Sequence, residues 1–252
     1  YTIDGPLEVR VGLKSKEHLL VKLKNGELHT TIFDYQLMTD KITQTDDFYY
    51  RGSIKDATHL ISNIQIPQWL VRDYKVQNGV SNSNNYGDIY MKVQNIKYEK
   101  AKLQRTGKGL LGFEKSCLED KWSYLRTLTY SSPNTTHSVM LPDSTITEFV
   151  TGEDFTKSII VNSITGLGTN RYLIKPTEST FFNYHENRKT KQDYITYDGY
   201  ANPTLVQFAT YTGTPDQVLE TKVVFTQYGA FGSSTPDKPI EMTTVLMRNA
   251  EP

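Results

Sequence analysis

Residues 18–37 read HLLVKLKNGELHTTIFDYQL, with two runs rich in apolar and β-branched side chains on either side of Asn25-Gly26. An Asn-Gly pair between two such runs is the strongest short-range signal for a β-hairpin, because both residues tolerate the positive φ angles of a type I′ turn. The segment therefore predicts two antiparallel strands joined by a tight turn.

Period-two alternation of apolar and polar residues recurs along the whole chain and predicts further short strands. The strand candidates are residues 7–13, 47–51, 57–66, 69–76, 88–98, 122–130, 144–150, 156–164, 170–175, 179–185, 192–197, 204–212, 219–229 and 241–248. Gly, Pro and Asn clusters separate most of them. Short strands with a turn signal every 8–12 residues or so are typical of sandwiches and barrels. We therefore expect an all-β fold, an antiparallel β-sandwich of the jelly-roll type with long loops.

One stretch departs from this alternation. Between Leu110 and Leu125, apolar residues at 111, 117, 118, 122 and 125 fit helical spacing, and charged residues cover the other face. We expect one short helix there, inserted in a loop. No break in composition divides the chain, so the sequence predicts a single domain over residues 1–230, followed by a C-terminal extension over residues 231–252.

Composition narrows the classes of protein to consider. The 252 residues include 28 Lys plus Arg against 28 Asp plus Glu, which argues against a protein that coats nucleic acid with its whole surface. Mean hydropathy is −0.52 and no long apolar run occurs, so no membrane span is expected. The single cysteine, Cys117, excludes an internal disulfide and a zinc site built from several thiolates.

No motif for catalysis stands out. Gly107-Lys108-Gly109-Leu110-Leu111-Gly112 matches G-x-G-x-x-G, but the β-hairpin surroundings and Ser132, 20 residues beyond Gly112, do not fit a dinucleotide site, so a flexible loop is the preferred interpretation. The five histidines lack metal-ligand spacing, and Cys117 is interpreted as a small core residue. We expect no enzymatic activity, no catalytic residue, no metal site and no cofactor.

Two basic stretches are candidates for nucleic-acid binding, because cations beside aromatic rings suit phosphate neutralisation and base stacking. The alternative is a solvated strand edge that lysine protects from aggregation. The candidate residues are Lys97, Lys100, Lys102, Arg105 and Lys108 in the first stretch, and Arg188, Lys189 and Lys191 in the second.

The C-terminal half carries a resemblance to a known family. Its residues are Tyr172-Leu173-Ile174-Lys175-Pro176, then 202–211 (NPTLVQFATY), then 220–228 (ETKVVFTQY). This pattern resembles the last strands of the single jelly-roll capsid proteins of circovirus-like circular single-stranded DNA viruses. The resemblance covers roughly residues 170–230. That family carries an Arg-rich N-terminal arm, and because the chain begins at Tyr1 rather than Met we expect a trimmed piece.

The resemblance implies a structural viral protein. We expect a capsid protein of the virion that self-assembles into an icosahedral shell enclosing the genome. Its expected partners are many copies of itself, encapsidated nucleic acid, and a host receptor or glycan. The alternative is a binding module, a carbohydrate-binding or phage tail or adhesin β-sandwich, with Trp69, Trp122 and surface tyrosines stacking on sugars.

Overall fold

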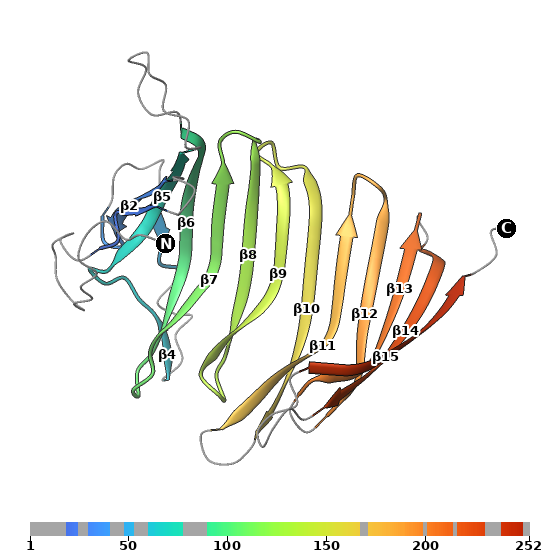
Figure 1. The fold of residues 1–252 in the computed structure, drawn as a ribbon. Helices are drawn as coiled ribbons and strands as arrows, with labels where there is room; N and C mark the ends of the chain where they lie inside the picture. Colours follow the sequence, from blue (N-terminus) through green and yellow to red (C-terminus); the bar gives the residue numbers. More distant parts are fainter. Residues whose placement is uncertain are drawn as a thin grey trace. The chain divides into compact units, whose positions relative to one another are not determined.

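A computed structural model describes residues 19–24, 30–40, 48–52, 60–77, 90–166, 171–198, 201–213, 216–229 and 238–248 (Figure 1). These residues form strands and turns, which confirms the predicted all-β class. No helix occurs among them, and so none there is long and apolar enough to cross a membrane.

The described residues form fifteen strands. They are β1 (Lys22–Lys24), β2 (Thr30–Leu37), β3 (Tyr49–Tyr50), β4 (Ile61–Asn63), β5 (Trp69–Gln77), β6 (Tyr90–Gln104), β7 (Gly109–Asp120), β8 (Leu125–Asn134), β9 (Val139–Phe149), β10 (Asp154–Gly166), β11 (Tyr172–Asn183), β12 (Arg188–Tyr197), β13 (Pro203–Thr212), β14 (Gln217–Gly229) and β15 (Lys238–Arg248). The predicted strand over residues 7–13 lies outside the described residues, as do the turn at Asn25-Gly26 and the histidines His18, His29 and His59.

Hydrogen bonds join the strands in the order β1-β2-β5-β6-β7-β8-β9-β10-β11-β12-β13-β14-β15, and β3 and β4 pair with β6. The registered pairs are antiparallel except for β3 with β6. From β5 onward each strand is bonded to the next in sequence, which is the order of a meander. The predicted all-β antiparallel class is confirmed. The order of the described strands differs in detail from a jelly roll, which is built from Greek keys, in which a long connection skips neighbouring strands.

The helix expected between Leu110 and Leu125 is also absent, because this segment forms β7, a turn and the start of β8. Residues of β7 pair with β6 on one side and with β8 on the other. Gly109 (φ 76°) and Gly112 (φ 142°) disfavour a helix at its start. Hydrogen bonds to two neighbouring strands thus outweigh a helical spacing of apolar side chains that was only local.

The chain divides into two compact units, of which unit 1 comprises residues 1–140 and 148–153. Its hydrophobic core gathers Met38, Phe48, Tyr49, Ile64, Leu70 and Ala101, with Tyr98 and Phe113 packed against it. The rings of Phe48 and Tyr98 meet edge to face at 5.6 Å, and those of Tyr98 and Phe113 lie 4.6 Å apart. Burial raises the pKa of Tyr98 to about 12, and its hydroxyl donates to the Val71 carbonyl.

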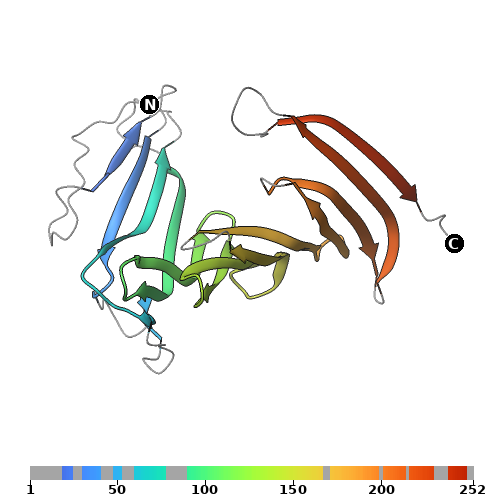
Figure 2. The ribbon, with the colours of Figure 1, turned by 90° about the horizontal axis from the view of Figure 1, so that it is seen from below.

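Unit 2 comprises residues 141–147 and 154–252 and is a succession of paired strands. Figure 2 shows β14 and β15 running alongside one another. The prediction of one domain over residues 1–230 and an extension from 231 has its boundary outside the described residues and stays a prediction. Within that extension, residues 238–248 form β15 and pair with β14.

Prolines in the described part of unit 2 lie in strands, just beyond the limits that the sequence predicted for those strands. Pro176, Pro203 and Pro239 each lie at a shift of register, opposite Asn162, Tyr197 and Tyr228 respectively. A proline has no backbone N–H to give to a neighbouring strand, and a bulge or strand end is where that loss is tolerated. These prolines therefore mark bulges or a strand end, and the pairing of β11 and of β15 continues past Pro176 and Pro239.

Candidate functional site

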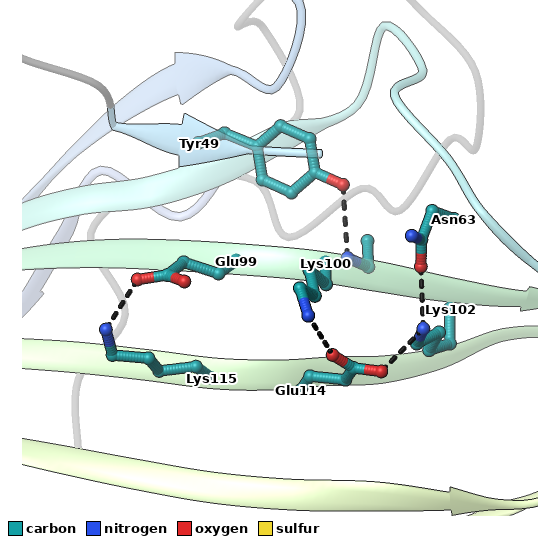
Figure 3. A network of polar contacts seen from close by, with 8 residues as sticks. Tyr49, Asn63, Glu99, Lys100, Lys102, Glu114 and Lys115 are labelled. Atoms are coloured by element: carbon teal, nitrogen blue, oxygen red, sulfur yellow. Dashed lines mark hydrogen bonds and ion pairs between the residues drawn. The ribbon is translucent and has the colours of Figure 1, made fainter. Parts of the chain in front are cut away.

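The candidate site in unit 1 is a network of charged side chains on β6 and β7 with one amide from β4. We call it the Lys102 network: Lys100, Lys102, Glu114 and Asn63 (Figure 3). Register pairs Glu99 with Lys115 and Ala101 with Phe113, so Lys100 lies opposite Glu114. Lys100 has a positive φ of 54°. In a regular strand, residues three apart point to opposite faces of the sheet. Tyr98 and Ala101 are three apart, yet both contact the core, so the positive φ at Lys100 accompanies a change of face.

Lys102 is the centre of this network and is 3% exposed. Its Nζ donates to Oε1 of Glu114 at 2.6 Å and to Oδ1 of Asn63 at 2.7 Å. Oε2 of Glu114 lies 3.1 Å from Nζ of Lys100. A buried ammonium is tolerated only when it is paired and hydrogen-bonded, and these contacts meet both conditions.

Electrostatics keeps Glu114 ionised. Burial is the largest influence on its pKa and raises it, but hydrogen bonds from Lys102 and Lys100 and the charges of both lysines together lower the pKa below its usual value. One carboxylate thus serves two lysines, and it carries its charge at neutral pH.

A second ion pair lies beside the first. Nζ of Lys115 is 2.7 Å from Oε1 of Glu99, and that hydrogen bond is the main reason why the pKa of Lys115 is raised. The Tyr49 hydroxyl accepts a hydrogen bond from the Ala101 amide at 3.1 Å and donates to the carbonyl of Ile64, which ties β3 and β6 together at this point.

A cavity of about 360 Å³ opens beside these charges. Its lining comprises Tyr50, Lys97, Glu99, Lys115, Cys117, Glu119, Arg126 and Leu128. Burial raises the pKa of the Cys117 thiol. Since the thiolate is the nucleophilic form of cysteine, this shift disfavours nucleophilic chemistry at neutral pH. Cys117 is half-buried here and lines a cavity, so its environment is more polar than that of a core residue.

The basic residues predicted from the sequence fall in both units, the first stretch in unit 1 and the second in unit 2. Arg105 is exposed, and Nζ of Lys108 donates to the His137 carbonyl at 2.6 Å. In unit 2, Lys189 pairs with Asp216, and Lys191 lies 3.0 Å from both Glu178 and Asp193, whose hydrogen bonds raise its pKa.

Several of these cations are therefore compensated within the protein, and Lys102 is inaccessible to a phosphate. Arg188 is the most exposed of the ion-paired group, with a side chain that is 57% exposed and 3.8 Å from Glu186. Binding of nucleic acid stays a prediction.

Two features escaped the sequence analysis. Glu114 and Asn63 complete the Lys102 network, but they lie 12 and 39 residues from Lys102 along the chain, and only the strand register shows that they meet it. The glycines of the G-x-G-x-x-G match allow backbone conformations that other residues rarely adopt, since all three have positive φ. Gly107 and Gly109 lie at the β6–β7 turn, and Gly112 lies at the register shift of this hairpin. Among the described residues, no group of three or more His, Cys, Asp or Glu side chains is placed to hold a metal ion.

Comparisons with known proteins give a similarity of structure but not of sequence. No family model matches the chain, and no curated protein matches it. Among solved structures, a chain of the "Crystal Structure of TcdB2-TccC3" matches with a TM-score of 0.54 and 6% sequence identity. The match covers 91% of this chain and 15% of that chain. At this identity the likeness shows the fold alone, and the present chain spans a small part of the length of the other.

Proposed function

We propose that this chain has a structural role, as a section of a longer β-sheet wall. The observation that carries the proposal is the state of β15. Residues 242–247 of this strand are all exposed, including Met242 (62%), Val245 (46%), Leu246 (46%) and Met247 (55%). β15 is the last strand in the order and bonds to β14 along one edge.

A long edge strand with exposed apolar side chains is a template for pairing with another strand. Side chains on both faces of β15 are exposed, because successive residues of a strand point to opposite sides of the sheet. In a longer wall, a further strand pairs with the edge of β15 that faces away from β14, and neighbouring side chains cover both faces of β15.

Other observations support a structural role. The meander order from β5 to β15 lets a sheet grow by simple addition of hairpins. The solved structure of similar fold is a much longer chain, of which the match covers 15%. The capsid subunit and the carbohydrate-binding module are more specific hypotheses, and both stay predictions. The icosahedral shell was inferred from the resemblance over residues 170–230, and the order of the described strands adds no support to it.

Amide hydrogen exchange tests the proposal. In an antiparallel edge strand, roughly half of the amides point to the neighbour and half point outward. In the 252-residue chain, the outward amides of β15 should exchange at rates close to those of exposed loops. In a longer chain or an assembly that continues the sheet, the same amides should be protected at least as strongly as those of β14.

Two results would count against a wall section. One is unprotected outward amides of β15 in such a longer chain or assembly. The other is a structure of it in which β15 remains an exposed edge strand.

A further inference from the structure

Unit 2 contains a cavity of about 260 Å³ at the end of two neighbouring hairpins. It is bounded by the β11–β12 turn, by the first residues of β12 and by the end of β13 with the turn that follows it. The lining residues are Phe182, Asn183, Tyr184, Asn187, Arg188, Lys189, Tyr211, Thr212, Gly213 and Asp216. Every lining residue belongs to unit 2.

The floor of this cavity is a row of side chains across three strands. Register places Phe182 opposite Lys189 and Lys189 opposite Tyr211, so the three share one face of the sheet. Nζ of Lys189 lies 4.6 Å from the centre of the Tyr211 ring and also pairs with Asp216. The Lys189 charge is thus held in place by an aromatic face and a carboxylate.

One wall of the cavity is aromatic. The rings of Phe182 and Tyr184 are nearly parallel, 12° apart in plane and 6.0 Å apart between centres. Tyr184 is 45% exposed although it lines the cavity, so a ligand can reach its ring. Flat aromatic faces suit the C–H face of a sugar ring, which buries apolar surface while its hydroxyls stay polar.

The rest of the lining supplies hydrogen-bonding groups. Asn187 offers an amide with an acceptor and two donors. Asn183 offers its two donors, since its Oδ1 accepts from the Glu186 N–H at 3.2 Å. The Thr212 hydroxyl donates to the Asn187 carbonyl at 3.3 Å and remains an acceptor. Asn187 has a positive φ of 48°, in the tight turn closed by its N–H to the Tyr184 carbonyl at 3.3 Å. Aromatic faces with a few polar groups around one concavity are the usual composition of a small-molecule site.

The charge of the lining narrows the class of ligand. Arg188 and Lys189 carry two positive charges against one negative charge on Asp216, which leaves a net charge of +1 on the lining itself. Glu186, outside the lining, forms an ion pair with Arg188. Lys189 is engaged by Asp216, whereas the Arg188 side chain is 57% exposed and 3.8 Å from Glu186, beyond hydrogen-bond distance. Arginine binds carboxylates through two parallel N–H donors.

We propose that this cavity binds one pyranose ring that carries a carboxylate, the class of the uronic and sialic acids. The ring lies against Tyr184 and Tyr211, its hydroxyls bond to the two asparagines, and its carboxylate faces Arg188. A volume of about 260 Å³ is below the range of drug-sized pockets and fits a single sugar unit. The proposal is independent of the wall function, because it uses residues of β11 to β13 and not β15.

Isothermal titration calorimetry and saturation-transfer NMR at low salt test this site with three probes: the methyl glycosides of glucuronic acid, N-acetylneuraminic acid and glucose. We expect saturable binding of at least one of the acidic sugars and at least tenfold weaker binding of glucose. Tyr184→Ala should weaken binding of that sugar at least tenfold. Arg188→Gln should remove the preference for the acidic sugar over glucose.

Phe181→Ala is the matched control, because Phe181 precedes the lining residue Phe182 on β11, is 43% exposed and does not line the cavity. Its affinity should equal that of the unchanged chain. Asn187→Gly removes one amide while keeping a residue that accepts positive φ, and it should weaken binding without unfolding the turn. The absence of saturable binding by both acidic sugars would overturn the proposal. An equal loss of affinity in the Phe181→Ala and Tyr184→Ala variants would overturn it as well.

Discussion

Lys102 shows how this protein accommodates a buried charged side chain on strand β6. The side chain is 4% exposed, and its ammonium contacts one carboxylate and one amide oxygen. The carboxylate of Glu114 is shared with the more exposed Lys100. Because Glu114 has two lysine partners and Lys102 has one carboxylate partner, we expect loss of Glu114 to cost more stability than loss of Lys102.

Glu114→Gln should lower the free energy of unfolding by about 3 kcal/mol, since breaking a buried pair leaves an uncompensated charge on Lys102. Lys102→Met should cost about 1 kcal/mol or less, because it removes the buried charge and leaves Glu114 paired with Lys100. Urea denaturation of both variants measures the difference. Equal costs for the two substitutions would contradict this account of the network.

The pKa of Glu114 predicts acid sensitivity. Its folded pKa lies below the usual value of 4.5, so its ion pairs add stability above pH 4.5, and that stability is lost as the pH falls through the lower folded pKa. The difference in stability between the unchanged chain and Glu114→Gln should therefore shrink below about pH 4.5. Urea titrations at a series of pH values measure it, and a difference that stays constant down to pH 2 or so would refute the assignment.

At the scale of elements, close approach of β3 to β6 depends on a glycine just after β3. Gly52 has φ +76°, and a Cβ there would lie 2.8 Å from Cγ of Lys100 and 3.2 Å from Nδ2 of Asn63. The segment that follows β3 thus passes against the Lys102 network at a distance that only glycine allows.

Gly52→Ala should destabilise the protein by about 2 kcal/mol, from a strained backbone together with a displaced Lys100 and Asn63. Gly152→Ala is the control, because Gly152 also has positive φ (+96°) but nothing lies within 4 Å of its added Cβ. The control should cost about 1 kcal/mol, from backbone strain alone. Thermal unfolding of both variants measures the effects, and a Gly52 cost no larger than the control would show that the contact is unimportant.

At the scale of the whole molecule, β15 ends the strand order with an exposed apolar edge. We expect the isolated 252-residue chain to self-associate through this edge when it is concentrated. Native proteins protect exposed edges with charged residues, lysine above all.

Val245→Lys should shift the isolated chain toward the monomer, as measured by light scattering coupled to size-exclusion chromatography. Val161→Lys is the control, since Val161 is similarly exposed (48%) but lies on β10, which is paired on both sides in the strand order. It should leave association unchanged. If both variants associate equally, the interface is elsewhere.

Much of the secondary structure was predictable from local chemistry. Asn25-Gly26 between two apolar runs predicted a hairpin, and β1 and β2 do pair. Lys24 lies opposite Thr30, however, so five residues connect the strands and not the two of the predicted tight turn. Pro176 and the stretch around Leu118 misled the prediction, because a proline is also compatible with a bulge, and a helical spacing also occurs by chance in a strand. Local patterns report which residues are extended but not which strands they bond.

The amino-acid sequence determined that the chain is all-β, because alternation and turn-forming residues act within a few neighbouring positions. Tertiary structure alone decided the meander order, the pairing of Lys102 with Glu114 and Asn63, and the meeting of Phe182, Lys189 and Tyr211 on one face. The physical reason is that side chains on neighbouring strands meet according to register. Register depends on the hydrogen bonds and packing of whole strands, and the short-range pattern does not encode it.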